Sequence, residues 1–320
     1  MGKGLKAALK SQQSRLKAKE KAQAAAHAIS LKGKKPQTEP ISNSSKSKPK
    51  GKEAPLSNQR PTIPFQPTDK ILLVGEGNFS FARALIVQPP SGLENLPPTN
   101  VTATAYDAEQ ECYDKYPEAE EIVMELRSRG AEVLFRVDAT KLEKVPGFKG
   151  RKWDRIVWNF PHAGKGITDQ DRNILSNQVL ILDFLRSASK FLKSGPVPLV
   201  HKPKRKKATE VDEDEMDPDS DEPSNRASTP VAARGTILIT LRNVPPYTLW
   251  GLPRLAKKPP QPTSANKHPN PPYTQLRSFV FHRDLWAGYE HRMTKGERAH
   301  GAGKTGEGGE DRTWEFCLRD

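Results

Sequence analysis

Two glycines and two polar residues, directly after a short aliphatic run, form the first candidate site. The run, Ile-Leu-Leu-Val at 71–74, predicts a strand that is buried on both faces of a sheet. Gly75 and Gly77 let the backbone turn sharply and approach a ligand closely. Glu76 and Asn78 add groups that can hold an amine, a carboxylate or hydroxyls. This pattern predicts the nucleotide-binding corner of an open α/β sheet, although a tight structural turn would look the same.

The second candidate site is Asn159-Phe160-Pro161-His162. It follows a predicted strand at 155–158, and open α/β sheets place their chemistry at the carboxyl ends of strands. Asn159 and His162 offer hydrogen bonds, and His162 is also a candidate proton acceptor. Phe160 offers a stacking face, and Pro161 stiffens the loop. A rigid proline turn with a surface histidine is the structural alternative.

Three segments resemble a known family. Gly-Glu-Gly-Asn-Phe-Ser-Phe at 75–81 resembles the first motif of the ribosomal RNA uridine-N3-methyltransferases of fungi and plants. Phe-Pro-His-Ala-Gly at 160–164 and Tyr-Glu-His-Arg-Met-Thr at 289–294 resemble two later segments. Pro-Tyr-x-x-Trp at 246–250 also has a counterpart, with Arg242 where the family commonly has lysine. The resemblance implies a class I methyltransferase fold, a Rossmann-like α/β sheet with helices on both faces.

The resemblance also implies the cofactor S-adenosyl-L-methionine. Its expected contacts in the first motif are Gly75, Glu76, Gly77, Asn78 and Phe79. Asp107 follows the second predicted strand, where a carboxylate accepts hydrogen bonds from the ribose hydroxyls of the cofactor. Asp138 follows the third, where it would accept from the amine of the adenine. Each aspartate equally well caps a helix or a turn.

The implied reaction is methyl transfer to N3 of a uridine in large-subunit, 25S-type ribosomal RNA. Asn159 and His162 are the expected catalytic residues. The expected contacts to the base are Phe160, Pro161, Tyr247 and Trp250. Tyr247 and Trp250 are equally plausible as core residues. Two other classes stay open: a non-catalytic RNA-binding ribosome-assembly factor on this fold, and a nucleotide-dependent oxidoreductase. The oxidoreductase is disfavoured because Ser80 stands where the dinucleotide fingerprint has its third glycine.

Periodicity and turn residues predict the elements that position these sites. Strands are expected at 71–74, 101–106, 132–137, 155–158, 235–241, 277–282 and 314–318, the last two as an antiparallel pair at the sheet edge. Ser80 is expected to cap the first helix, one helical segment to run through Cys112 and Leu126 to a stop at Gly130, and a long helix to occupy 169–192.

Composition divides the chain into a tail and a body. Only 34% of the 320 residues are apolar, against about 45–50% in ordinary domains, so a large part is expected outside a core. We expect a basic, largely disordered tail with a possible helix at 1–62 and a methyltransferase domain at 63–320. Disordered inserts are expected within that domain at 196–233, 257–272 and 296–311.

The charge of the tail predicts its partner. Residues 1–60 contain 15 Lys/Arg and three Asp/Glu, which is 12 of the 14 net positive charges. Such an arm is expected to bind the phosphates of ribosomal RNA or pre-ribosomal particles, although it can also be merely solvating. A basic run at 202–207 resembles a nuclear import signal, which favours the nucleus and nucleolus. Cys112 and Cys317 lack metal-site spacing, and no apolar run has membrane-spanning length, so neither a metal nor a membrane is expected.

Overall fold

The computed structural model describes residue 14 and residues 61–198, 233–262, 268–292 and 309–320. Nearly all of these residues belong to one body, made of residues 63–259 and 270–320. Most of the predicted tail at 1–62 and most of the predicted inserts at 196–233 and 296–311 lie outside the described residues.

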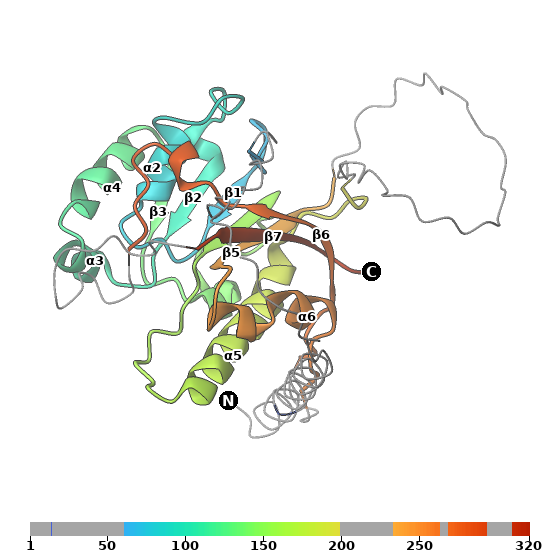
Figure 1. Ribbon diagram of the computed structural model, residues 1–320. Coiled ribbons are helices and arrows are strands. Elements are labelled where there is room, and N and C mark those ends of the chain that lie inside the picture. The colour runs from blue at the N-terminus through green and yellow to red at the C-terminus, as the bar shows by residue number, and fades with distance from the viewer. Residues whose placement is uncertain (1–13, 15–60, 199–232, 263–267, 293–308) are drawn as a thin grey trace, which may run out of the picture. The chain divides into compact units, whose positions relative to one another are not determined.

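A seven-stranded sheet runs through this body in the order β3-β2-β1-β4-β5-β7-β6 (Figure 1). The strands are β1 (Ile71–Leu73), β2 (Val101–Thr104), β3 (Glu132–Leu134), β4 (Arg155–Asn159), β5 (Thr236–Arg242), β6 (Tyr273–Val280) and β7 (Asp311–Leu318). The first five strands pair in parallel, whereas β7 is antiparallel to both β5 and β6. The structure confirms the predicted α/β architecture and the antiparallel pair at the sheet edge.

The order of the strands reverses between β1 and β4, which pair in the middle of the sheet. β2 and β3 continue on one side of this pair, and β5 on the other. Open α/β sheets bind ligands at such a reversal, in the crevice beyond the carboxyl ends of the strands. Gly75 lies just after β1 and Asn159 ends β4, so the two predicted sites meet at this point.

Helices cover both faces of the sheet (Figure 1). One face carries α2 (Ser80–Ile86), α3 (Glu109–Lys115) and α4 (Ala119–Ser128), and the other α5 (Gln170–Ala188) and α6 (Leu252–Lys257). Successive side chains of a strand point to opposite faces. Leu73 and Val157 therefore join the apolar core with α2 and α4, while the ring of Trp158 lies 4.5 Å from that of Phe184 in α5. Burial of both faces explains the unbroken aliphatic run in β1.

Two of the predicted strands are too long. β2 ends at Thr104 rather than at residue 106, and β3 ends at Leu134 rather than at residue 137. Beyond β3, Arg136 has a left-handed φ of 59°, and its backbone N–H donates to the carbonyl of Asp107 at 3.0 Å. This bond joins the loops that follow the two strands and replaces the regular ladder.

The predicted single helix through Cys112 and Leu126 is two helices, α3 and α4. Tyr116, between them, has φ −136° and ψ 86°, because a residue that precedes a proline, here Pro117, is driven out of the helical region. Gly130 ends α4 as predicted, with φ 91° and a backbone bond from its N–H to Arg127. The long helix α5 is also confirmed, and its N-cap is Asp169, whose carboxylate accepts from the N–H of Arg172.

The predicted start of β7 is wrong. This strand begins at Asp311, which was expected in the loop 296–311, and it pairs with β5 over seven residues. Thr313 and Glu315, which are 3% and 1% exposed, are polar residues at buried positions. They interrupt the apolar pattern by which a buried strand is recognised in a sequence.

The predicted insert 257–272 is also wrong at both of its ends. Lys257 is the last residue of α6. Near the other end, Asn270 is buried, and its Oδ1 accepts a hydrogen bond from Nη1 of Arg186 in α5 at 2.8 Å. β6 then begins at Tyr273, four residues before the predicted start, and its tyrosine hydroxyl donates to the carbonyl of Leu185 at 2.7 Å.

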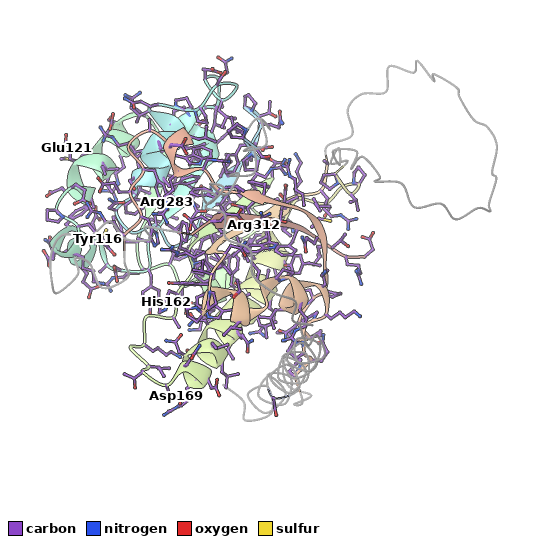
Figure 2. All side chains as sticks on the ribbon, viewed as in Figure 1. Tyr116, Glu121, His162, Asp169, Arg283 and Arg312 are labelled. Carbon is purple, nitrogen blue, oxygen red and sulfur yellow. The ribbon has the colours of Figure 1, made fainter. Side chains whose placement is uncertain are left out.

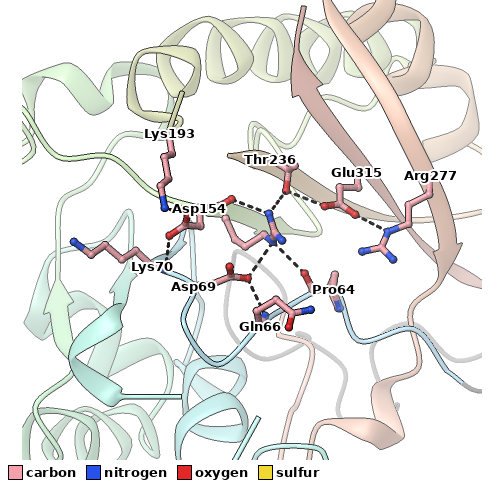
Figure 3. A network of polar contacts seen from close by, with 10 residues as sticks. Pro64, Gln66, Asp69, Lys70, Asp154, Lys193, Thr236, Arg277 and Glu315 are labelled. Atoms are coloured by element: carbon pink, nitrogen blue, oxygen red, sulfur yellow. Dashed lines mark hydrogen bonds and ion pairs between the residues drawn. The ribbon is translucent and has the colours of Figure 1, made fainter. Parts of the chain in front are cut away.

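A buried polar network joins the amino-terminal ends of β4 and β5 to β7 and β6 (Figure 3). The candidate sites follow the other, carboxyl-terminal ends of the parallel strands. Arg155, which begins β4, pairs through Nε with Asp69 at 3.2 Å and donates through Nη1 to Thr236 of β5 at 3.3 Å. Thr236 donates to Glu315 of β7 at 2.9 Å, and Glu315 accepts from Arg277 of β6 at 2.6 Å. The network therefore links the segment that precedes β1 to the four strands β4, β5, β7 and β6.

Candidate active site

The turn after β1 has a conformation that requires glycine. Gly75 has a φ of +68°, and a Cβ at this position would lie 2.7 Å from the indole Nε1 of Trp158. The backbone of the turn therefore lies directly against a side chain of β4. Glycine at this position therefore lets the turn after β1 pack on that indole without a clash.

The polar residues of the turn bond to the start of α2. Glu76 accepts a hydrogen bond from the N–H of Ala82 at 3.2 Å, and Asn78 Oδ1 accepts from the N–H of Ser80 at 3.2 Å. The prediction that Ser80 caps α2 is wrong: Ser80 is the first helical residue, and the N-cap, Phe79, makes no side-chain cap bond. Side chains from the preceding turn satisfy the free N–H groups instead.

Burial changes the acidity of Glu76. Burial raises the pKa of this carboxyl to about 7, although the N–H groups of Ala82 and Phe81 lower it. The carboxyl therefore changes its charge near neutral pH. Phe79 contributes differently, because its side chain is 0% exposed and its ring packs on Phe135 at 5.4 Å. Only the backbone of Phe79 is available to a ligand.

The segment 289–292 lies beside the glycine turn. Ser80 Oγ donates to the carbonyl of Glu290 and accepts from its N–H, both at 3.1 Å. Arg292 pairs with Glu118 at 2.8 Å, and Glu118 accepts from Asn78 at 2.8 Å. The family-like segments at 75–81 and 289–292, distant in the sequence, are thus joined by hydrogen bonds and an ion pair beside the glycine turn.

Asp107 and Asp138 have different surroundings. Asp107 is not the cap of α3, whose N-cap is Ala108, and its carboxylate pairs with Lys115 at 2.7 Å. Asp138 accepts from both the N–H and the hydroxyl of Thr140 and from Lys141, at 2.7 to 2.9 Å. Burial raises the pKa of Asp138, but the hydrogen bonds from Lys141 and Thr140 outweigh this effect, so the pKa lies below its usual value. Asp138 thus caps the turn after β3, as its structural alternative predicts.

Tyr106 was missed by sequence reasoning. Its ring is 70% exposed, next to Asp107 and beyond the end of β2. An exposed aromatic side chain at the carboxyl edge of the sheet is a stacking surface for a planar ligand. The signal in the sequence was the aromatic residue beside the acidic one at the end of a predicted strand.

At the end of β4, Asn159 pairs in the ladder with Thr240 of β5. The Oγ1 of Thr240 donates to Asn159 Oδ1 at 2.8 Å. Asn159 Nδ2 is buried and has no hydrogen-bond partner among the residues that the structure describes. A buried donor of this kind is uncommon in folded proteins and marks a place for a ligand acceptor.

Phe160 and His162 point to different surroundings. Phe160 has a left-handed φ of 52°, its ring lies 4.2 Å from that of His291, and the guanidinium of Arg283 lies 5.2 Å over it. Protein groups therefore already flank the ring that was expected to stack on a base. Pro161, between the two, is buried.

His162, Tyr247 and Trp250 share one cavity of about 210 Å³ near the amino end of α5. Figure 2 labels His162 and Asp169, the N-cap of that helix. The other lining residues of the cavity are Ile167, Thr168, Gln170, Asn173 and Pro246. The ring of Trp250 lies 5.0 Å from Tyr247 and 6.0 Å from His162. The volume is below the roughly 300–1,000 Å³ of drug-sized sites, so a single planar ring suits it better than a whole cofactor.

The surroundings of His162 fix its neutral form. The N–H of Gly164 donates to His162 Nδ1 at 3.0 Å, so the proton of the neutral imidazole is on Nε2. Desolvation by the surrounding protein lowers the pKa of His162 and so favours this neutral form. Part of the residue is still accessible to solvent. His162 therefore presents an N–H donor, and it can take up a proton at Nδ1 only if the bond from Gly164 breaks.

The described part of the chain contains neither a cluster of metal ligands nor a membrane-spanning helix. Among residues 61–198, 233–262, 268–292 and 309–320, no three His, Cys, Asp or Glu side chains are grouped as metal ligands. Within the same ranges, no helix has both the length and the apolar character needed to span a membrane.

The parallel sheet with an antiparallel β7, the glycine turn after β1 and the acidic residue after β2 define a class I methyltransferase. A family model described as "rRNA (uridine-N3-)-methyltransferase BTM5-like" matches residues 72–293, more than half of the chain. The chain therefore belongs to this BMT5-like family.

Three individual proteins are similar to this chain, and the name of the first agrees with this assignment. The 25S rRNA (uridine(2634)-N(3))-methyltransferase of Saccharomyces cerevisiae is 29% identical over 267 residues, which are 75% of this chain and 70% of the yeast protein. An uncharacterised protein of Arabidopsis thaliana is 35% identical over 142 residues, 43% of this chain and 65% of its own length. The mouse ferredoxin-fold anticodon-binding domain-containing protein 1 homolog is 40% identical over 129 residues, 40% of this chain and 19% of its own length.

Proposed function

We propose that this protein transfers a methyl group from S-adenosyl-L-methionine to N3 of a uridine in large-subunit ribosomal RNA. The observation that carries the proposal is the unpartnered Nδ2 of Asn159 at the β1/β4 reversal. The neighbouring residue, Trp158, lies against the glycine turn, so a donor for the target base and a turn for the cofactor share one place. Membership of a family of ribosomal RNA uridine-N3-methyltransferases supports the reaction.

The residues at the carboxyl edge fit the cofactor. Gly75 lets the turn pack directly on the indole of Trp158, and the carboxylate of Asp107, paired with a partly exposed Lys115, keeps lone pairs for ribose hydroxyls. Tyr106 offers a face to the adenine, and Glu76 a carboxylate to the ammonium group. When bound, the cofactor supplies a methyl group on a sulfonium, which a nitrogen lone pair can displace. Asp138 stabilises the turn after β3, and this turn is the proposed wall beside the adenine.

The cavity at His162 is the proposed pocket for the target base. Tyr247 and Trp250 offer stacking surfaces, and His162 Nε2–H donates to a carbonyl oxygen of the uracil. The chain aligns N3 with the methyl donor rather than reacting covalently. The proton of N3 leaves to solvent, because Nδ1, the one basic nitrogen of the His162 tautomer, already accepts the hydrogen bond from Gly164.

The substrate RNA and the cellular compartment are inferred from the charge of the tail and from the similarity to the yeast protein. The yeast relative is named for 25S rRNA, and the basic tail of this chain suits phosphate binding within pre-ribosomal particles. Arg254 of α6 adds a partly buried guanidinium whose Nη2 has no partner among the described residues. Modification during ribosome biogenesis places the protein in the nucleus and nucleolus, in line with the basic run at 202–207, which lies outside the described residues.

The test is methylation of unmodified large-subunit ribosomal RNA with labelled cofactor, followed by mapping of the label. We expect label on N3 of a uridine. Asp107→Ala should weaken cofactor binding in calorimetry by about 1–3 kcal/mol, the range for hydrogen bonds to a charged group. The matched control is Asp114→Ala, an exposed carboxylate on the same α3. Label on another base would refute the assigned reaction, and cofactor binding without any transfer would favour a non-catalytic assembly factor.

A further inference from the structure

Two asparagines of α5 hold a loop that forms part of the wall of the proposed base pocket. The backbone N–H of Ala163, at the start of this loop, donates to Asn177 Oδ1 at 2.8 Å. At the other end, the carbonyl of Ile167 accepts from Asn173 Nδ2 at 3.2 Å. The two amides also bind each other, because Asn177 Nδ2 donates to Asn173 Oδ1 at 2.9 Å. This asparagine pair, Asn173 and Asn177, therefore fastens both ends of the loop 163–167 to α5.

Backbone groups fix the direction of both amides. A backbone N–H only donates, so the Asn177 atom that faces Ala163 is the oxygen. A backbone carbonyl only accepts, and the carbonyl of Asn173 accepts from Asn177 Nδ2 at 3.0 Å. The carbonyl of Ile167 likewise requires the nitrogen of Asn173, which leaves Asn173 Oδ1 to accept from Asn177. The reversed arrangement would set two donors against each other at Ala163 and two acceptors at Ile167.

The loop depends on this support because its glycines restrict the backbone little. Gly164 and Gly166 have left-handed φ values of 63° and 62°, and glycine adopts many other conformations as readily. Asn177 is 1% exposed. Asparagine is a weaker helix former than leucine, and a buried amide is unfavourable unless it is hydrogen-bonded. Its bond to the loop therefore explains Asn177 better than helix stability or apolar packing does.

The bond between Asn177 and Ala163 also bears on His162. Ala163 and Gly164 have consecutive N–H groups, of which the first donates to Asn177 and the second to His162 Nδ1. Because a buried side chain holds the first N–H, the second keeps the orientation in which it meets the imidazole. His162 and Ile167, at the far end of the loop, both line the cavity. The asparagine pair thus supports two parts of the pocket wall.

We propose that Asn177 is a positioning residue, which keeps His162 in the Nε2–H tautomer and in place for the target base. This inference rests on the proposed function, in which that N–H donates to a carbonyl oxygen of the base. Asn177 does not line the cavity itself and acts through Ala163 and Gly164. The described residues that line the cavity include no Asp, Glu, Lys or Arg, and Tyr247 carries the one other ionisable group. The bond from Gly164, rather than a charge in the cavity, therefore holds the imidazole.

Nitrogen NMR on the full chain with labelled histidine reads the tautomer directly, without RNA or cofactor. His162→Gln identifies the signals of His162 among those of the seven histidines. In the wild type with neutral His162, we expect an unprotonated Nδ1 and a protonated Nε2. Asn177→Ala should give a mixture of both tautomers, because Gly164 is then free to leave Nδ1. Asn177→Asp keeps an oxygen that accepts from Ala163, and should keep the wild-type tautomer.

Turnover gives a second measurement, which separates positioning from general damage. Asn177→Ala should lower methylation of the large-subunit RNA by up to about tenfold, the scale of one hydrogen bond. In a protein that already carries His162→Ala, it should lower turnover no further, because the residue through which it acts is gone. An equal loss in both backgrounds would overturn the inference. A wild-type protein that does not methylate uridine would overturn the proposed function, while the NMR spectra still decide on the role of Asn177.

The matched control is Ser187→Ala, in the same helix. Ser187 is 2% exposed, and its hydroxyl accepts from the N–H of Leu142, in a 3₁₀ helix at 139–144, at 2.7 Å. The control therefore also removes a buried side chain of α5 that binds a backbone N–H from another segment. It should leave the tautomer of His162 unchanged. A wild-type tautomer in Asn177→Ala would overturn the inference, and so would a mixture in Ser187→Ala.

Hydrogen exchange in the wild type decides if Asn177→Ala does not fold. The amide of Ala163, bonded to a buried side chain, should exchange slowly, and that of the exposed Lys165 in the same loop should exchange fast. Equal exchange at the two positions would show that Asn177 does not hold the loop, and would overturn the inference.

Discussion

His162 acts in the proposed pocket as a donor rather than as a base, because Gly164 occupies its Nδ1. His162→Ala should lower turnover about tenfold, as expected for one lost hydrogen bond, without changing cofactor affinity. His162→Gln is the matched variant, since its amide also offers an N–H, and it should recover part of the rate. Turnover and calorimetry on the three proteins measure this.

The pH dependence of turnover separates the two roles of His162. Burial lowers the pKa of His162, so the neutral donor form persists down to pH values below the usual pKa of about 6.5. We expect wild-type turnover to fall only below that value, as protonation of Nδ1 breaks the bond from Gly164. His162→Gln should lack this acid limb. If the histidine is instead the base that takes the N3 proton, His162→Gln should be as slow as His162→Ala at every pH, because an amide does not take up that proton.

Glu76 gives a second titration, this time in cofactor binding. Burial raises its pKa to about 7, so the carboxylate loses its charge as the pH falls through neutrality. If it holds the ammonium group of the cofactor, affinity should weaken on acidification from about pH 8 to about pH 6. Glu76→Gln should bind more weakly at high pH and show no such change. Glu121→Gln, at an exposed position of α4, is the control for calorimetry. Equal pH dependence in wild type and Glu76→Gln would remove the carboxylate from the site.

Sequence reasoning located these residues well and their partners poorly. The turn at Gly75 and the position of Asn159 could be predicted because glycines and aliphatic runs act locally. The neighbours of Phe160 could not, because His291 and Arg283 come from a segment more than 120 residues away. The hydrogen bond between Thr240 and Thr313 was invisible for the same reason: it depends on the register between β5 and β7.

Among the elements, the helices and parallel strands were predictable and the antiparallel edge only in part. α5 has a strong apolar period and a clear cap at Asp169, which are both local signals. β7 instead inserts between β5 and β6 and buries Glu315, so its sequence does not resemble a core strand. The ion pair with Arg277 and the hydrogen bond from Thr236, which also accepts from Arg155, make that buried carboxylate tolerable.

Arg155 should therefore contribute strongly to the stability of the sheet. Arg155→Met removes the partner of buried Asp69 and a donor to Thr236, and should lower the free energy of unfolding by about 3–5 kcal/mol. The matched control is Arg129→Met, which breaks a largely exposed pair with Glu125 and should cost about 0–1 kcal/mol. Urea unfolding of the three proteins measures both. A loss in Arg155→Met no greater than in the control would show that the network is not needed.

The loss in Arg155→Met should depend on pH, with a sign set by Asp69. Burial raises the pKa of Asp69, although Arg155 lowers it, so the variant should raise it further. A raised acid in the folded state gains stability as the pH falls through its pKa, because protonation removes the buried charge. The deficit against wild type should thus be smaller at about pH 5 than at about pH 8. A deficit that grows on acidification would contradict this assignment.

For the whole molecule, the distribution of charge separates recognition of RNA from chemistry. Of the 14 net positive charges, 12 belong to residues 1–60, so the remaining 260 residues are close to neutral. A nearly neutral body holds little RNA through phosphate contacts alone. The tail, which lies almost wholly outside the described residues, is therefore the proposed source of affinity, and the body the source of selectivity.

Deletion of residues 1–60 should weaken binding to ribosomal RNA and flatten its dependence on salt, because each lost phosphate contact removes about 0.7–0.9 from the logarithmic salt slope. Methylation of a short oligonucleotide with the target uridine should fall less than methylation of the full RNA. A tail with scrambled sequence and the same 15 Lys/Arg is the control, and it should bind as the wild type does. Equal losses on both substrates would make the tail part of the active site, and no loss on either would leave it a solvating segment.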